Sequence, residues 1–229
     1  MKKGWRDYLE NVLVAIFLAL VVRTFLLTGY KVPTSSMAPT LIPGDFIFAY
    51  RLPFGLQVPL MENKLGGRSP RRGEVVVFRY PDQLRTSYVK RVIGLEGDRI
   101  QIENGELSIN GKKAQYMPAE KGWLPAGMAA LAKDAEAYRE KTEYSEQIVL
   151  FQKGFQRKNF GPIVVPPGEV FLLGDHRDVS DDSRYWGTVP LDKIDGHIWM
   201  VWMSIDSRKL SGVSSGFKIR WDRLMTVIR

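Results

Sequence analysis

The chain has 229 residues, of which 45% are apolar and 25% are charged, and it carries a formal net charge of +8 at neutral pH. It contains no cysteine, which excludes disulfides, thiol catalysis and zinc–thiolate sites, and two histidines are too few for an all-histidine metal site. The positive charge is compatible with binding of nucleic acid, with an anionic membrane surface, or with simple solubility.

The first predicted element is a membrane anchor within residues 1–30. The apolar run at 12–22 is too short to cross a bilayer, but a segment that continues to Tyr30 reaches the about 20 residues that a crossing needs. Arg23 would then extend its charged end to the interface. Basic residues before the run predict a cytoplasmic N-terminus, so one crossing of the plasma (inner) membrane would place residues 31–229 on the extracytoplasmic side.

Two other interpretations of this segment compete with the anchor. A basic start followed by a short apolar core is also typical of a cleaved secretory signal, although no small-residue cleavage site follows the run. A buried helix of a soluble domain is the second alternative.

Beyond the anchor the sequence predicts mostly strands. Segments rich in β-branched and aromatic residues indicate strands at 45–52, 73–81, 87–95, 98–114, 169–175 and 196–206. The letters ENGE inside 98–114 signal a hairpin turn between two alternating runs. Residues 127–146 are rich in alanine and charge, and they are the one internal helix that we predict.

This pattern favours a mainly β fold with a partly closed, barrel-like antiparallel sheet. We expect residues 31–100 and 166–212 to form this catalytic β domain, and residues 101–165 to form a smaller inserted β-rich lobe. Residues 213–229 are a basic amphipathic tail, for which two interpretations stay open. One is an interfacial helix on anionic lipid, and the other is a last core strand with a frayed end.

The loop VPTSSMAPTLIPGDF, residues 32–46, is the first candidate for chemistry. Ser36 lies between Pro33 and Pro39, and prolines stiffen a loop because they restrict their own backbone and that of their neighbours. A stiff loop suits a nucleophile. The alternative is an ordinary turn, since serine and proline are common turn residues.

The strand SYVKRVIG is the second candidate. Alternation places Lys90 on one face with Tyr88 and Val92, so this lysine lies among apolar neighbours. A desolvated lysine has a lowered pKa, and its neutral amine can accept the proton of a serine. The alternative is an edge-strand lysine that guards against aggregation.

The polar stretch GDHRDVSDDSRYWG, residues 174–187, is the third candidate. Its interleaved aspartates and arginines indicate an ion-paired network that fixes a loop. Calcium is a competing reading of the aspartate spacing, but the glycine and distal glutamate of the helix–loop–helix calcium motif are absent, and nearby arginines disfavour a cation. We therefore expect no metal.

Four segments, in this order behind the apolar N-terminus, together resemble the conserved boxes of type I signal peptidase: SSMAPTL, RGEVVVFRYP, YVKRVIGLEGD and GDHRDVSDDSRYWG. The resemblance covers most of the chain. It implies a membrane-bound serine endopeptidase with a Ser–Lys dyad, which removes N-terminal signal peptides from exported preproteins after small residues in an A-x-A pattern. It implies no cofactor.

The resemblance also assigns roles by position. Ser36 matches the nucleophile, Lys90 the general base, and Ser180 the serine that orients this lysine. Thr34 matches the residue whose hydroxyl completes the oxyanion hole with the Ser36 amide, and Met37 belongs beside the substrate cleft. The charged residues that would support the site are Arg91, Asp175, Asp182 and Arg184.

The sequence departs from the family pattern at three positions. His176 and Val179 stand where asparagines are common, and Glu96 replaces a frequent proline. None of these replaces a matched catalytic residue. Because Lys90 fills the base position, we do not expect His176 to act as a base, and we interpret His197 as a structural histidine on a strand.

Other functions remain as alternatives. A Ser–Lys peptidase of a specialised secretion or conjugation system would keep the chemistry and change the substrate, whereas a self-cleaving repressor would need a DNA-binding domain that no pattern before residue 31 indicates. A catalytically silent membrane-tethered scaffold is a third possibility. As partners we expect secretory preproteins and anionic membrane lipids, and no nucleic acid, because the charge suits an anionic membrane surface.

Overall fold

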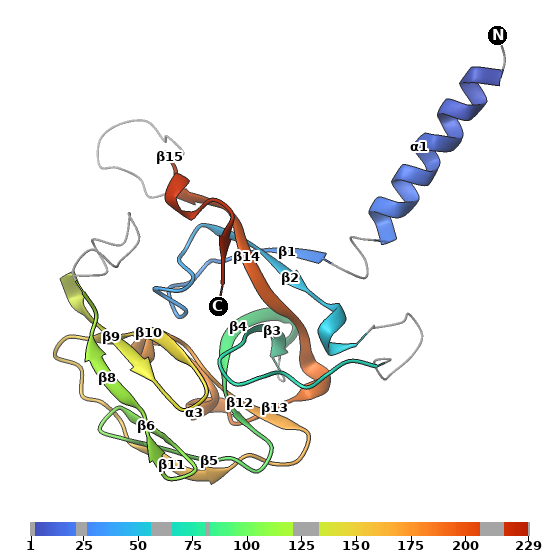
Figure 1. The fold of residues 1–229 in the computed structure, drawn as a ribbon. Helices are drawn as coiled ribbons and strands as arrows, with labels where there is room; N and C mark the ends of the chain where they lie inside the picture. Colours follow the sequence, from blue (N-terminus) through green and yellow to red (C-terminus); the bar gives the residue numbers. More distant parts are fainter. Residues whose placement is uncertain are drawn as a thin grey trace.

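Antiparallel strands make up most of the protein (Figure 1). The computed structural model describes residues 3–21, 27–55, 66–80, 83–120, 133–206 and 218–228. The largest sheet runs in the order β1-β2-β14-β3-β4-β12-β13, and β15 and β16 also pair with β14. Its strands are β1 Leu27–Lys31, β2 Asp45–Tyr50, β3 Val75–Tyr80, β4 Gln83–Leu95, β12 Glu169–Leu173, β13 Val189–Pro190, β14 Ile194–Asp206, β15 Lys218–Ile219 and β16 Thr226–Val227.

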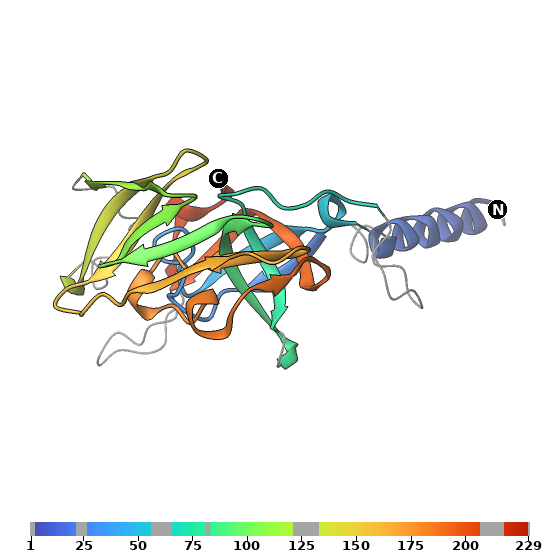
Figure 2. The ribbon, with the colours of Figure 1, turned by 90° about the horizontal axis from the view of Figure 1, so that it is seen from below.

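Two smaller sheets come from the segment between β4 and β12. Their orders are β11-β5-β6-β7 and β10-β9-β8. Their strands are β5 Arg99–Glu103, β6 Glu106–Ile109, β7 Lys112–Lys113, β8 Gln115–Pro118, β9 Ala135–Lys141, β10 Glu146–Gln152 and β11 Phe160–Val164. Figure 2 shows these strands on one side of the large sheet, away from the N-terminal helix.

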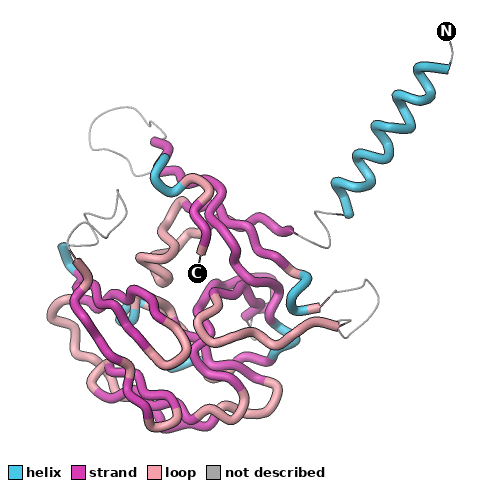
Figure 3. The backbone as a smooth tube through the Cα atoms, viewed as in Figure 1, coloured by secondary structure: helices cyan, strands magenta, loops and turns pink. Residues whose placement is uncertain are grey.

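Helices are few in the described part of the chain (Figure 3). The α-helical elements are α1 Lys3–Val21 and the single turn α3 Ser183–Trp186. The 3-10 turns are η2 Leu52–Phe54, η3 Arg177–Val179, η4 Leu191–Lys193 and η5 Trp221–Arg223. A mainly β architecture with a curled antiparallel sheet is therefore confirmed.

Each of the six segments predicted as strand contains at least one strand, and the predicted hairpin is confirmed. Glu103 pairs with Glu106 across a two-residue turn. Asn104 and Gly105 in that turn have φ angles of 51° and 82°, as the twist of a tight hairpin requires.

The helix predicted within 127–146 is wrong for residues 135–146, whereas residues 133–134 are helical. Residues 135–141 form β9, which pairs along its whole length with β10, and β10 begins at Glu146. The apolar face of β10 is buried, so pairing with this strand outweighs the intrinsic helix preference of the alanine- and charge-rich segment. Residues 127–132 lie outside the described residues.

The predicted anchor is partly corrected. Helix α1 extends away from the sheets (Figures 1 and 2), but Leu27 to Tyr30 belong to β1, where their backbone pairs with β2. These residues are therefore sheet and not the end of an anchor. Within the ranges described, no helix is long and apolar enough to cross a bilayer. Arg23 lies outside the described residues.

The C-terminal segment packs as short strands. Of the two interpretations, the interfacial helix is wrong for residues 218–228, which form β15, η5 and β16. Arg223 is buried, and its guanidinium makes two hydrogen bonds of 3.0 and 2.5 Å to the carboxylate of Asp45. This ion pair fixes the segment to the start of β2. Residues 213–217 and 229 lie outside the described residues.

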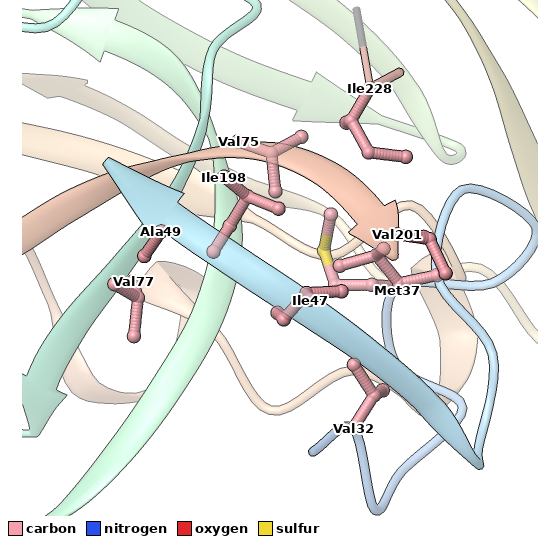
Figure 4. Close-up of a cluster of buried hydrophobic side chains, with 10 residues drawn as sticks. Val32, Met37, Ile47, Ala49, Val75, Val77, Ile198, Val201 and Ile228 are labelled. Atoms are coloured by element: carbon pink, nitrogen blue, oxygen red, sulfur yellow. The ribbon is translucent and has the colours of Figure 1, made fainter. Parts of the chain in front are cut away.

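The core under the large sheet also holds the loop between β1 and β2. Figure 4 shows Met37 of this loop among side chains from β2, β3 and β14. The buried members of this cluster are Val32, Met37, Leu41, Ile47, Ala49, Val75, Val77, Ile198, Val201 and Ile228. Because close-packed cores tolerate little displacement, the loop has a fixed position relative to the strands.

Candidate active site

The loop that carries Ser36 is closed at its base and seated in the core. Val32 N donates to Asp45 O at 2.8 Å, and Gly44 N donates to Val32 O at 3.0 Å. Met37 is only 2% exposed. The apolar methionine side chain therefore faces inward, while the preceding serine is partly exposed at the turn.

Lys90 reaches this serine from β4. It pairs with Val76 in β3, and its side chain is only 2% exposed. Lys90 Nζ donates to Ser36 Oγ at 2.9 Å. Burial lowers the pKa of Lys90 from 10.5 to about 8, although the nearby carboxylates of Asp182 and Asp181 oppose that change. The amine is thus much closer to its neutral form near pH 7 than an exposed lysine is.

The side chain of Thr34 also lies next to the Ser36 hydroxyl. Its Oγ1 lies 3.3 Å from Ser36 Oγ. A cavity of about 360 Å³ opens over the hydroxyls and the amine. Its walls include residues 30–37 on one side and 86–90 on the other, so Met37 borders the cavity as well as the core.

The polar loop after β12 packs directly against the backbone of Ser36. His176 N donates to Ser36 O at 3.1 Å. A Cβ added at Gly174 would lie 2.2 Å from Ser180 Oγ and 2.5 Å from Ser36 O. Only glycine fits there without a shift, and this close approach brings Ser180 next to the turn that holds Ser36.

Ser180 does not make the hydrogen bond that the resemblance implied. Its hydroxyl is buried, and in the described part of the chain it has no hydrogen-bond partner. The structure thus places Ser180 beside the loop that holds Ser36 but does not join it to Lys90.

A buried ion pair ties three segments together. Arg91 Nε and Nη2 donate to the two carboxylate oxygens of Asp175 at 2.8 and 2.7 Å. Arg91 also donates to Gly73 O at 2.6 Å and to Thr40 Oγ1 at 3.1 Å, and Thr40 donates to Asp175. The residue next to Lys90 is therefore linked to both the polar loop and the Ser36 loop.

Asp182 and Arg184 form a second pair within the polar loop. Asp182 caps α3 and accepts from Gly174 N at 3.0 Å. Arg184 Nε donates to Asp182 Oδ1 at 2.7 Å. Because Asp182 is fully buried, the pair holds the two ends of this loop, at Gly174 and at α3, against each other.

Sequence reasoning missed a third buried pair, between Arg177 and Glu140. Arg177 Nη2 lies 2.7 Å from Glu140 Oε1, and Nη1 lies 2.5 Å from Oε2. Arg177 was visible as part of the polar motif. No sequence pattern indicated Glu140 as a partner, because it is 37 positions away in a segment that we predicted to be a helix.

The imidazole rings of the two histidines have no hydrogen-bond contact with Ser36 or Lys90 among the interactions of the described residues, although the His176 backbone contacts Ser36. Burial lowers the pKa of His176 and that of His197 below their ordinary value, which favours the neutral imidazole in both. His197 lies on β14, in line with its expected place on a strand. In the residues described, no group of three or more histidine, aspartate or glutamate side chains is arranged to hold a metal ion.

Comparisons with known proteins agree on one family. The family described as signal peptidase, peptidase S26, matches residues 5–203. Signal peptidase I of Pseudomonas fluorescens is 36% identical over 90% of this chain and 75% of that protein. Signal peptidase I of Pseudomonas aeruginosa is 34% identical with the same coverage. A crystal structure of a signal peptidase I from Enterococcus faecalis V583 aligns at 26% identity and a TM-score of 0.34, over 57% of this chain and 97% of that one.

Proposed function

The chain belongs to the signal peptidase family, peptidase S26, and from that premise we propose that it is a Ser–Lys endopeptidase with Ser36 as nucleophile and Lys90 as general base. Its substrates are exported preproteins, which it cleaves between the N-terminal signal peptide and the mature chain. The observation that carries the proposal is the 2.9 Å contact between Lys90 Nζ and Ser36 Oγ, with a lysine that is 2% exposed.

Acylation begins when neutral Lys90 takes the proton of the Ser36 hydroxyl. The serine oxygen attacks the carbonyl carbon of the scissile bond, and the carbonyl oxygen takes the negative charge. Collapse of this intermediate breaks the carbon–nitrogen bond. The lysine ammonium gives its proton to the leaving amine, which releases the mature protein and leaves the signal peptide as an ester on Ser36.

Deacylation uses the same base. Neutral Lys90 takes a proton from a water molecule, whose oxygen attacks the ester carbonyl. Collapse expels the Ser36 oxygen, which recovers its proton from Lys90. The Thr34 hydroxyl and the Ser36 amide stabilise the oxyanion in both steps. The Ser180 hydroxyl has no partner in the described part of the chain, which leaves it available to orient the lysine amine.

The substrate binds as an added strand. Strand β12 pairs with β4 from Arg91 to Leu95. Residues 86–90, which precede this paired stretch of β4, line the cavity. An extended peptide placed there would form main-chain hydrogen bonds with the sheet and point alternate side chains into it. The cavity wall includes Val32, Val77 and Val89, which suits small apolar residues at positions −1 and −3 of the substrate.

The N-terminal segment that contains helix α1 anchors the enzyme in the plasma membrane, with a cytoplasmic N-terminus and the sheets on the extracytoplasmic side, although α1 as described is by itself too short or too polar for a crossing. Support comes from its apolar side chains, which are exposed around the helix: Leu13 is 56% exposed and Phe17 is 65% exposed. Lipid would cover this surface, and anionic lipid would attract the cationic chain. Carbonate washing of membranes tests the anchor, and release of the protein into the soluble fraction would contradict it.

The decisive experiment incubates the purified full chain in detergent with a preprotein. We expect cleavage by the wild type and by Ser35→Ala, and none by Ser36→Ala or Lys90→Ala. No cleavage by the wild type would favour a silent scaffold, whereas cleavage by Ser36→Ala would refute the assignment of the nucleophile.

A bulky aromatic residue at position −1 of the preprotein should block cleavage, and unchanged cleavage would contradict the small-residue specificity.

A further inference from the structure

The sheet formed by β8, β9 and β10 contacts the polar catalytic loop, residues 174–184, along its edge. Leu150 N donates to Asp175 O at 2.8 Å, and Leu150 and His176 form an isolated parallel bridge. Gln152 N donates to Asp178 Oδ2 at 2.8 Å. An element inserted far from Ser36 in sequence therefore pairs with the loop that packs against Ser36.

Beneath this edge lies the buried ion pair of Arg177 and Glu140. Arg177 is 3% exposed and Glu140 is 0% exposed. Glu140 also accepts from Tyr116 Oη and from Gln147 Nε2, each at 2.6 Å. The carboxylate is thus held by groups from β8 and β10 as well as by the arginine, which makes its position rigid.

Arg177 links Glu140 to the backbone of the catalytic loop. Its Nε donates to Gly174 O at 3.2 Å, and its own carbonyl accepts from Arg184 Nη2 at 2.5 Å. Gly174 is the residue that packs against Ser180 and the Ser36 carbonyl. A displacement of Arg177 would therefore shift Gly174 and, through it, the backbone of Ser36.

We propose that Glu140 is a positioning residue for peptide-bond cleavage, which acts through Arg177 to hold residues 174–184 against Ser36 and Lys90. The inserted sheet then serves as a brace for the catalytic loop. This inference rests on the proposed function, because the step that it tunes is the one carried out by Ser36 and Lys90.

A brace and a substrate-binding residue have different kinetic consequences. Glu140 and Arg177 do not line the cavity over Ser36, so their loss should leave KM unchanged and lower kcat. A looser loop would also admit water around Lys90 and reduce its desolvation. Its pKa would rise, and the acidic limb of the pH–rate profile would move to higher pH.

The test compares Glu140→Gln with Glu146→Gln in the full-length enzyme. Glu146 at the start of β10 makes an ion pair at 2.9 Å with Arg139 of β9, the strand that also carries Glu140, but that pair is exposed. We expect Glu140→Gln to lower kcat by about tenfold to hundredfold at constant KM and to shift the acidic limb upward. Glu146→Gln should match the wild type. A Glu140→Gln enzyme with wild-type kcat and pH profile would overturn the proposal.

A second variant decides the matter if Glu140→Gln does not fold. Asp178→Ala removes the acceptor of the Gln152 N–H at a half-buried position, and we expect a smaller fall in kcat with the same upward shift of the acidic limb. Wild-type kinetics for this variant would then overturn the proposal that the inserted sheet braces the catalytic loop.

Hydrogen exchange separates this inference from the proposed function, because it needs no activity. Faster exchange at 174–184 in Glu140→Gln, with unchanged exchange in β2 and β14, supports the brace even if the wild type cleaves no preprotein. Unchanged exchange at 174–184 contradicts it.

Discussion

The Nζ atom of Lys90 lies 2.9 Å from the Oγ atom of Ser36, although 54 positions separate the two residues. Two independent features produce this contact. Strand pairing with β3 sets the place of Lys90, and burial of Met37 in the core sets the place of the adjacent Ser36. The two members of the proposed dyad are therefore both held by rigid elements, as a preorganised site requires.

The pKa of Lys90 predicts how cleavage depends on pH. Burial lowers that pKa to about 8, and only the neutral amine accepts the proton of Ser36. The value of kcat/KM should rise with pH and level off above about 8, and it should fall about tenfold for each unit below that value. Steady-state kinetics across this range tests the assignment, and a rate that stays constant between about pH 6 and 8 would contradict it.

The same burial should cost stability. In the unfolded chain Lys90 titrates near its ordinary value of 10.5, whereas in the folded chain its pKa is about 8. The folded state is therefore penalised below about pH 8, where the buried amine is charged, and it gains stability as pH rises from about 8 to 10.5. Lys90→Met should be inactive yet more resistant to urea at pH 7, by about 3 kcal/mol in free energy of unfolding. The gain should disappear above pH 10.5, and a variant less stable than wild type at pH 7 would contradict this account.

Thr34 should matter for the transition state and not for folding. Thr34→Val keeps the shape of the side chain but removes the hydroxyl 3.3 Å from Ser36 Oγ. We expect kcat to fall by about a hundredfold or more, with little change in KM or in melting temperature, because Thr34 is exposed. Thr34→Ser should retain most of the activity. Equal kcat values for the valine variant and the wild type would remove Thr34 from the oxyanion hole.

Gly174 is expected to tolerate no side chain. In Gly174→Ala the new methyl group would lie 2.2 Å from Ser180 Oγ and 2.5 Å from Ser36 O, so the catalytic loop or the nucleophile must move. A displacement near 1 Å at a reacting group costs about a hundredfold in rate, and we expect at least that loss in the cleavage assay. The matched control is Gly29→Ala, where the added carbon would lie 3.9 Å from Cε1 of Phe48, an ordinary van der Waals distance. An alanine at 174 with wild-type activity would show that the loop adapts.

Local patterns in the sequence were enough to predict the strands, the hairpin turn and the apolar surroundings of Lys90. Alternation of apolar residues, as in Ile100 and Ile102 of β5, reports which face of a strand is buried. Asn104 and Gly105 report a turn because few other residues accept positive φ. Each of these signals is contained in a few contiguous residues.

Long-range pairing decided the rest, because its free energy comes from partners that no local window contains. Residues 135–141 are a strand since β10 offers a buried face to pair with, and Leu27 to Tyr30 are a strand since β2 lies beside them. The pairing of Arg177 with Glu140 depends on how the inserted sheet packs against the catalytic loop. The sequence could therefore indicate which residues carry the chemistry, whereas only the tertiary structure determined what holds them in place.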